Sequence, residues 1–215
     1  MLFQGRPAAA DANAPVEFLR GDTSKAQVAL TFDCGPWVDA RYLNAILDAL
    51  EEYGHRVTFF VAGQFIEKHE EVFAQRIAPV HEVANHSYSH PNFPTSSAAV
   101  IRQEFRWTEE LVARDGAGSH GMWRAPFGAR TPRELNIAAD EGYPTHIMWT
   151  VDSGDWLPLP AERVKARVLQ GEENGSIIVE HCNSWQSAQV LPDVLWQLRE
   201  WGMNVVTVSE VISPP

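Results

Sequence analysis

Two histidines, His86 and His90, have the spacing in this chain that points most directly to chemistry. They lie four positions apart in the segment Asn85–His90, so one helical turn of backbone places both imidazoles on the same side. Imidazole nitrogen is a common ligand of divalent metals, but a metal site needs at least a third protein donor. By itself, the pair is equally compatible with two surface histidines in a polar loop. The remaining ligand, a base and an acid must therefore come from elsewhere in the chain.

Further polar side chains that could do chemistry follow the ends of predicted strands. They are Asp33, Cys34, Arg124, Asp152, Asp155 and His181. Each has an ordinary structural explanation by itself, as a turn residue before glycine, an ion-pair partner, a loop cap or a buried histidine. In α/β barrels, however, active sites are built from the loops at the carboxyl ends of the strands. The shared position of these residues therefore indicates an enzyme.

The segments that must position these residues alternate between strand and helix patterns. Strands are predicted at Ala26–Phe32, Val57–Val61, His81–Asn85, Met122–Arg124, His146–Val151, Ser176–Glu180 and Asn204–Val208. Helices are predicted at Tyr42–Tyr53, Gly63–His69, Glu71–Ile77, Pro132–Gly142, Ala161–Gln170 and Leu191–Glu200, and a further helix runs through Val112 from a cap at Ser96 or Ser97. The alternation implies an α/β fold with a parallel sheet covered by helices, either a barrel or an open doubly wound sheet.

Length and composition exclude several classes of protein. The 215 residues fit one domain, which we assign to residues 16–215, and residues 1–15 resemble a tag remnant and linker. No apolar run is long enough to span a membrane, and we expect a monomer. The net charge of -11, without a basic cluster, argues against binding to nucleic acid.

The sequence resembles the polysaccharide deacetylase (NodB-homology, carbohydrate esterase) family in a series of short motifs. The motifs are Thr31–Pro36, Asn85–His90, Arg124–Gly128, Asp152–Trp156 and Ile177–His181. The resemblance extends over nearly the whole chain and implies a distorted (β/α) barrel with about seven parallel strands. It also implies hydrolysis of acetyl groups on carbohydrate such as chitin or peptidoglycan, a divalent metal, most often zinc, and an extracellular or periplasmic location.

The resemblance assigns roles to the polar residues. Asp33 would be the general base that takes a proton from a metal-bound water, and Arg124 would orient its carboxylate. His181 would be the general acid that protonates the leaving amine, with Asp155 fixing its tautomer.

The resemblance also implies a set of substrate contacts and a set of metal ligands. The substrate contacts are Trp156 and Val179, which would wall a slot for the acetyl methyl, together with Pro126 and Phe127, near which a backbone N–H would stabilise the oxyanion. The metal ligands are His86, His90 and the residue after the base, Cys34.

Cys34 departs from the family pattern, which has a second aspartate at this position as the third metal ligand. A thiolate is a good zinc ligand, and we expect Cys34 to complete the site with His86 and His90. The alternative is a disulfide with Cys182, because the first and last motif loops share one face of the family fold. That bridge would remove the third ligand. An engineered substitution at Cys34 is a third possibility.

Three functions are compatible with these residues. The first is a metal-dependent carbohydrate N-deacetylase. The second is a metal-independent amidohydrolase that acts on a small non-sugar amide, as allantoinase-like relatives do. The third is a non-catalytic glycan-binding protein, to which the eight tryptophans would supply stacking surfaces. The presence of a full base, acid and orienting set argues against the third function.

Overall fold

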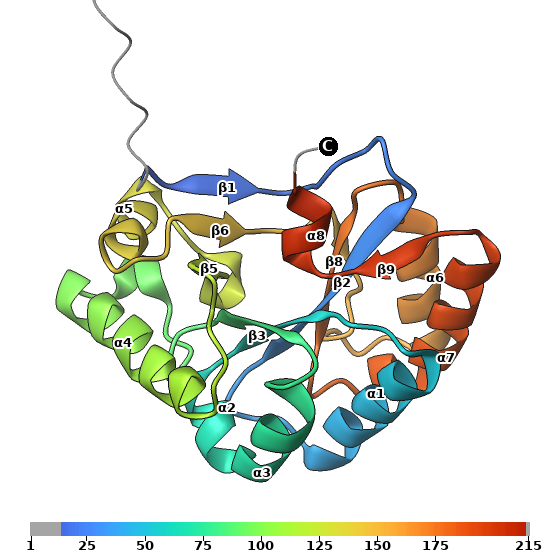
Figure 1. Ribbon diagram of the computed structural model, residues 1–215, viewed down its shortest axis with the longest axis horizontal. Helices are drawn as coiled ribbons and strands as arrows, with labels where there is room; N and C mark the ends of the chain where they lie inside the picture. Colours follow the sequence, from blue (N-terminus) through green and yellow to red (C-terminus); the bar gives the residue numbers. More distant parts are fainter. Residues whose placement is uncertain (1–13, 214–215) are drawn as a thin grey trace, which may run out of the picture.

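A curved sheet of parallel strands forms the centre of the protein, and helices surround its outer side (Figure 1). The structure is a computed structural model and describes residues 14–213. The strands are β1 Val16–Phe18, β2 Gln27–Cys34, β3 Thr58–Val61, β4 Glu82–Asn85, β5 Met122–Trp123, β6 Thr145–Ile147, β7 Val151–Asp152, β8 Ile177–His181 and β9 Asn204–Val206. Their order is β1-β6-β5-β4-β3-β2-β8-β7, and β9 pairs with β2. All of these strand pairs are parallel, so the carboxyl ends lie on one side.

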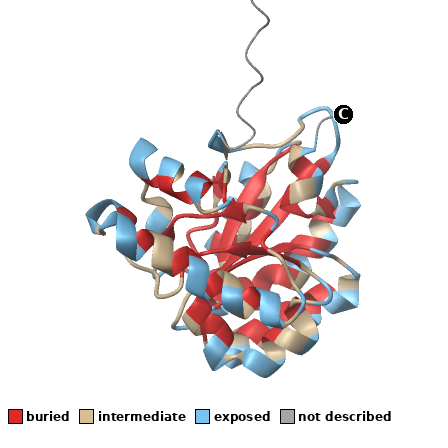
Figure 2. Ribbon diagram, turned by 60° about the vertical axis from the view of Figure 1, so that its left-hand side comes forward, coloured by how far each residue is buried: buried red, intermediate tan, exposed pale blue. Residues whose placement is uncertain are grey.

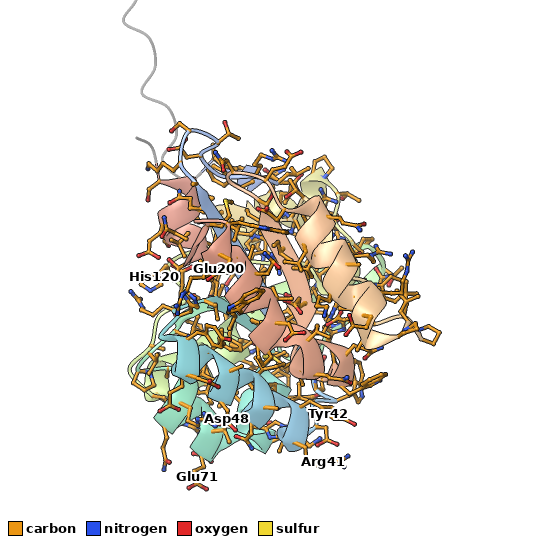
Figure 3. All side chains as sticks on the ribbon, turned by 90° about the vertical axis from the view of Figure 1, so that its right-hand side faces the viewer. Arg41, Tyr42, Asp48, Glu71, His120 and Glu200 are labelled. Carbon is orange, nitrogen blue, oxygen red and sulfur yellow. A yellow bond between two sulfur atoms is a disulfide. The ribbon has the colours of Figure 1, made fainter. Side chains whose placement is uncertain are left out.

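The helices pack around this sheet. They are α1 Ala40–Tyr53, α2 Gly63–Lys68, α3 Glu70–Val72, α4 Ala98–Arg114, α5 Pro132–Asp140, α6 Ala161–Gly171, α7 Trp185–Glu200 and α8 Val208–Ile212, with short turns η1 Phe73–Ile77, η2 Phe93–Thr95 and η3 Pro126–Gly128. Helix α7 packs against both α1 and α6, and Figure 3 views this helical face from outside. The helix boundaries follow ordinary capping chemistry. For example, the Asp39 side chain caps the start of α1, and Gly54 ends it in the left-handed conformation.

Strand β2 is buried along its whole length, and its side chains alternate between two environments. Leu30, Phe32 and Cys34 belong to the large apolar cluster between the sheet and the helices, whereas Ala29 belongs to a smaller cluster on the other face. Figure 2 shows the buried strands at the centre and the exposed outer surfaces of the helices. The alternation sends Asp33 to the inner face of the curved sheet and Cys34 to the helical side.

The predicted fold class is confirmed, with differences in detail. The sheet has nine strands rather than about seven. The single strand expected at His146–Val151 is two short strands, β6 and β7, which lie at different places in the sheet. Helix α7 begins at Trp185 rather than at the predicted Leu191, and Pro192 lies inside it. Strand β1 and helix α8 were not predicted, since three and five residues carry too little periodicity.

Residues 1–15 were interpreted as a tag remnant and linker. Of these, residues 1–13 lie outside the described part of the chain. Within residues 14–213 no helix has the length and apolar character that crossing a membrane requires.

The expectation that Cys34 is a free thiolate ligand is wrong for this structure, because Cys34 and Cys182 form a disulfide. Cys34 is the last residue of β2 and Cys182 comes directly after β8, so each follows one of the register partners Asp33 and His181, and their Cα atoms are 5.0 Å apart. Both are fully buried in the apolar cluster on the helical side. The bridge therefore joins the ends of the two strands that carry Asp33 and His181.

Removing this bridge is expected to destabilise the fold. The disulfide closes a loop with a sequence separation of 148 residues, and closing a long loop restricts the unfolded chain. We expect the double variant Cys34→Ala/Cys182→Ala to lose about 2 to 5 kcal/mol in the free energy of unfolding. Urea unfolding of the variant and the parent protein measures the difference, and a reductant should change the stability of the parent alone. A loss below about 1 kcal/mol would contradict a stabilising bridge.

Candidate active site

A cavity of about 400 Å³ opens at the carboxyl ends of the strands, and most of the residues predicted to do chemistry contribute to it. Its lining consists of Asp33, Gly35, Trp37, Val38, His86, His90, Phe127, Gly128, Trp149, Asp152, Trp156, Val179, His181 and Asn183. The predicted base, histidines and acid thus converge on one place, although they come from distant parts of the chain. Arg124 and Asp155 lie directly behind the wall, in contact with Asp33 and His181.

Asp33 is held by a buried ion pair with Arg124. The Arg124 Nη1 donates to Asp33 Oδ1 at 2.7 Å and to the Thr31 hydroxyl at 2.8 Å. The guanidinium is fully buried, its Nε donates to the carbonyl of Ile147, and it stacks 3.9 Å from the centre of the Phe60 ring. Because its donors are satisfied by fixed groups, the arginine fixes the direction of the carboxylate.

The charge state of Asp33 follows from this pairing. Burial by itself would raise the pKa of the Asp33 carboxyl, but the positive charge and hydrogen bond of Arg124 outweigh it and hold the pKa below its ordinary value. Asp33 is therefore ionised at neutral pH. Its second oxygen, Oδ2, is directed toward the Nε2 of His86 at 3.7 Å.

The two histidines of the second motif meet in the cavity as the spacing predicted. Their ring centres are 4.9 Å apart. The Nδ1 of His86 lies 2.8 Å from the carbonyl oxygen of Arg124, which can only accept, so Nδ1 carries the proton and Nε2 presents a lone pair to the cavity. Burial lowers the pKa of His86 and lowers that of His90 to about 3. Both imidazoles are thus neutral and able to act as ligands.

The loop that carries His90 is held by a residue that sequence reasoning missed. Ser87 and His90 have positive φ angles of 66° and 61°, a conformation that side chains other than glycine seldom adopt. Glu104 on α4 is buried and accepts hydrogen bonds from the backbone N–H groups of Tyr88 and Ser89. An acidic residue on the mainly apolar, buried face of α4 was the available signal for this role.

A metal ion fits this arrangement only in part. His86 and His90 offer two donors, and the Nδ1 of His90 is buried without a hydrogen-bond partner. The third donor is missing, because the sulfur of Cys34 is bonded to Cys182 on the helical side. Within residues 14–213 no group of three or more His, Cys, Asp or Glu side chains is arranged to hold a metal. The donor set is incomplete, and no catalytic step is assigned to a metal.

His181 and Asp155 form the second charged pair. The Nδ1 of His181 lies 2.7 Å from Asp155 Oδ1, and the backbone N–H of His181 donates to Asp155 Oδ2 at 2.8 Å. Burial would lower the pKa of His181, but the hydrogen bond and negative charge of Asp155 dominate and raise it to about 9. The imidazole is therefore protonated at neutral pH, and its Nε2 is not engaged by Asp155 and is available as a proton donor.

The residues predicted to contact a substrate divide into two groups. Trp156, Val179 and Phe127 line the cavity, and the Nε1–H of Trp156 donates to Asp152 Oδ1 at 3.3 Å. Trp156 and Phe127 are more than half exposed, so their rings are open to a ligand. Pro126 is instead buried in η3 and is not part of the lining. Its contribution is to shape the turn that presents Phe127.

Trp37, Trp149 and Asn183 also line the cavity, although none of them was among the predicted catalytic, metal-binding or substrate-binding residues. Trp37 is 67% exposed and its ring packs edge-on against His90. The two tryptophans belong to the set expected to supply stacking surfaces, whereas nothing in the sequence marked Asn183.

Comparison with known proteins gives a consistent match. The family model for polysaccharide deacetylase matches residues 20–146. A peptidoglycan-N-acetylglucosamine deacetylase of Bacillus cereus is 31% identical over 195 residues, which cover 89% of this chain and 70% of that protein. The peptidoglycan-N-acetylmuramic acid deacetylase PdaC of Bacillus subtilis is 27% identical, and there the match covers 88% of this chain but 39% of the relative. The chain thus spans less than half of some curated relatives.

One similar solved structure is a CE4 family pseudoenzyme from Bacillus anthracis. It superposes with a TM-score of 0.84 at 29% identity, covering 93% of this chain and 70% of that chain. A mutant of the same protein is described as having restored enzymatic activity, and it matches with the same TM-score at 30% identity, covering 93% of this chain and 72% of the mutant chain. The chain is therefore equally similar in fold to an inactive protein and to its reactivated mutant, so the fold by itself does not indicate activity.

Replacing Arg124 tests the buried ion pair. Because the pKa of Asp33 is lower in the folded protein, its charge stabilises the fold above the unfolded pKa, and this contribution is lost as the pH falls through the folded pKa. In Arg124→Met the carboxylate is buried without its cation, so we expect a loss of about 3 to 5 kcal/mol at pH 7. The loss should be smaller at pH 4.5, because the buried Asp33 carboxyl of the variant, without its cation, then takes up a proton and is no longer charged.

Urea unfolding at both pH values measures this effect. Arg41→Met is the control, because Arg41 pairs with Asp39 at the surface and should change stability by less than about 1 kcal/mol. An equal loss for Arg124→Met at pH 7 and pH 4.5 would show that packing, rather than charge, accounts for the change.

Proposed function

The chain belongs to the polysaccharide deacetylase family of carbohydrate hydrolases, and on this premise we propose that it removes acetyl groups from N-acetylated sugars of a peptidoglycan-type glycan. The observation that carries the proposal is the placement of an ionised carboxylate and a protonated imidazole at one cavity. Asp33 and His181 are register partners on the adjacent strands β2 and β8. The names of the relatives, which act on peptidoglycan N-acetylglucosamine or N-acetylmuramic acid, support the substrate class.

In the proposed reaction, Asp33 acts as the base and His181 as the acid. A water molecule beside Asp33 Oδ2 gives its proton to the carboxylate while its oxygen forms a bond to the acetyl carbonyl carbon. The resulting tetrahedral intermediate breaks its C–N bond as His181 Nε2 donates a proton to the sugar nitrogen. The products are acetate and the free amine, and proton exchange with water returns both residues to their starting states.

The aromatic rim of the cavity supports a sugar ligand. The exposed faces of Trp156, Phe127 and Trp37 offer flat apolar surfaces of the kind on which sugar rings stack. Val179 is almost completely buried beside Asp152 and His181, where it presents a small apolar surface suited to the acetyl methyl. Asn183 lies beside them as a polar group that can bond a sugar hydroxyl.

Metal dependence is the point at which this chain differs from what its family implies. Enzymes of the family generally depend on a metal ion, and the resemblance implies zinc, but His86 and His90 are two donors without the third that a zinc site needs. The disulfide at Cys34 and the similarity to a solved pseudoenzyme favour a second candidate, a glycan-binding protein with little or no hydrolytic activity. The same disulfide supports an extracellular or periplasmic location, where such bridges persist.

Acetate release from N-acetylglucosamine oligomers and from purified peptidoglycan, with and without added zinc, tests the proposal. We expect turnover, and we expect His181→Ala to reduce kcat about 10² to 10⁴-fold because the leaving amine would lack a proton donor. His120→Ala is the matched control, since His120 lies on the surface outside this cavity and should leave turnover unchanged. Full activity of the His181 variant would contradict the assignment of the acid.

Two other outcomes select other functions. Saccharide binding by calorimetry with no acetate release under any condition would select the glycan-binding candidate. Turnover of a small ureide, with none of the acetylated saccharides, would select the non-sugar amidohydrolase.

A further inference from the structure

The turn that presents Phe127 to the cavity has a backbone that needs outside support. Phe127 and Gly128 follow one another with positive φ angles of 60° and 64°. The turn is closed by the backbone N–H of Gly128, which donates to the carbonyl of Ala125 at 2.9 Å. A phenylalanine in the left-handed conformation is costly, so contacts from the rest of the fold must offset that cost.

Two contacts hold this turn, one at each end. At its start, the backbone N–H of Ala125 donates to the Nε2 of His146 at 3.2 Å. At its end, the Nη1 of Arg130 donates to the carbonyl of Gly128 at 3.3 Å. His146 is fully buried on β6, and the centre of its ring lies 4.4 Å from that of Trp123. The imidazole is therefore a fixed point against which the turn is held.

Both contacts depend on one carboxylate, that of Glu17 on β1. Glu17 and His146 are register partners on the paired strands β1 and β6, which lie side by side in Figure 1. The Glu17 Oε2 lies 2.8 Å from the Nδ1 of His146. The same carboxylate accepts hydrogen bonds from Arg130, from Nε at 2.7 Å and from Nη2 at 2.8 Å. Glu17 thus joins the two side chains that hold the ends of the turn.

The contact with Glu17 decides which nitrogen of His146 carries the proton. Hydrogen bonds from Arg130 hold the pKa of Glu17 below its ordinary value, so the carboxylate is ionised and can only accept. Nδ1 of His146 must therefore carry the proton, which leaves a lone pair on Nε2 for the N–H of Ala125. In the other tautomer, Nε2–H would face the N–H of Ala125 and this hydrogen bond would be lost.

We propose that Glu17 is a positioning residue of the saccharide site, which fixes, through its two partners, the turn that presents Phe127. The Phe127 ring is 65% exposed in the cavity lining and packs edge-on against His90, with the ring centres 4.5 Å apart. Without the carboxylate, both ends of the turn are released and the ring leaves its place beside His90. The effect on saccharide binding rests on the proposed function, whereas the contact between Phe127 and His90 does not.

Histidine NMR tests this role without any need for activity. In the parent protein, the nitrogen shifts of His146 should show a protonated Nδ1 and an unprotonated Nε2, and a nuclear Overhauser effect should join the rings of Phe127 and His90. In Glu17→Met, the Nδ1–H of His146 would be buried without an acceptor. We therefore expect part of the His146 population to carry its proton on Nε2, and the Overhauser effect to weaken.

Two further variants separate this role from a general loss of stability. Glu141→Met is the matched control, because Glu141 also accepts two hydrogen bonds from one arginine, Arg106, but lies outside the cavity. It should leave the His146 shifts and the Overhauser effect as in the parent. Arg130→Met should weaken the Overhauser effect but keep the His146 tautomer, because Glu17 still accepts from Nδ1.

Saccharide binding gives the functional readout. We expect Glu17→Met to weaken the binding of N-acetylglucosamine oligomers in calorimetry about 5- to 10-fold, because the ligand must then order a turn that has lost about one hydrogen bond. Arg130→Met should weaken binding less, and Glu141→Met should not change it.

Three results would overturn the proposal. One is a parent protein whose His146 carries its proton on Nε2, a result that does not depend on whether any variant folds. The others are a folded Glu17→Met variant that keeps the parental contact between Phe127 and His90, or one that keeps the parental saccharide affinity. A parent that binds no saccharide would count against the proposed function, whereas the NMR signals would still decide the role of Glu17.

Discussion

The alternation of side chains along the buried strand β2 is the constraint on which the rest of the site depends. Asp33 faces the inside of the curved sheet, where the buried guanidinium of Arg124 keeps it ionised and fixes its direction. Its neighbour Cys34 must then face the helices, where it is bonded to Cys182. Strand β8 repeats the pattern, with His181 inside and Cys182 outside. One pair of adjacent strands therefore supplies the proposed base and the proposed acid to the cavity and a covalent bridge behind them.

In this geometry the groups proposed for proton transfer are present while the metal ligands are incomplete, because Cys34 stands where the family pattern has a second aspartate. The proposed proton-transfer groups are both present, since Asp33 and His181 each have a charged partner that shifts the pKa so that Asp33 is ionised and His181 is protonated at neutral pH. The metal ligands are not complete, since His86 and His90 converge without a third donor. The result is a site with intact acid–base groups and a weakened metal position. That combination explains why the family's hydrolytic function and a binding function both have support in this chain.

Much of this arrangement could be predicted from the sequence, because motif residues followed strands whose apolar patterns were clear. The parallel α/β fold, the cavity and the convergence of Asp33, His86, His90 and His181 are all present as predicted. The disulfide between Cys34 and Cys182 was the alternative to thiolate ligation, and the choice between the two depends on which face of β2 the Cys34 side chain occupies. Glu104 was missed because it acts on backbone N–H groups from a distant helix, and the start of α7 was placed at Leu191 rather than Trp185, since tertiary packing overrides local propensity.

The zinc content of the oxidised protein tests this account most directly. The protein would be equilibrated with zinc and dialysed, and a thiol titration under denaturing conditions would first establish that both cysteines are bridged. With Cys34 bonded to Cys182, two imidazoles alone should not retain the metal, so the account predicts well below one zinc per chain. One tightly bound zinc per chain, in protein without a free thiol, would show that another residue completes the site and would contradict the account.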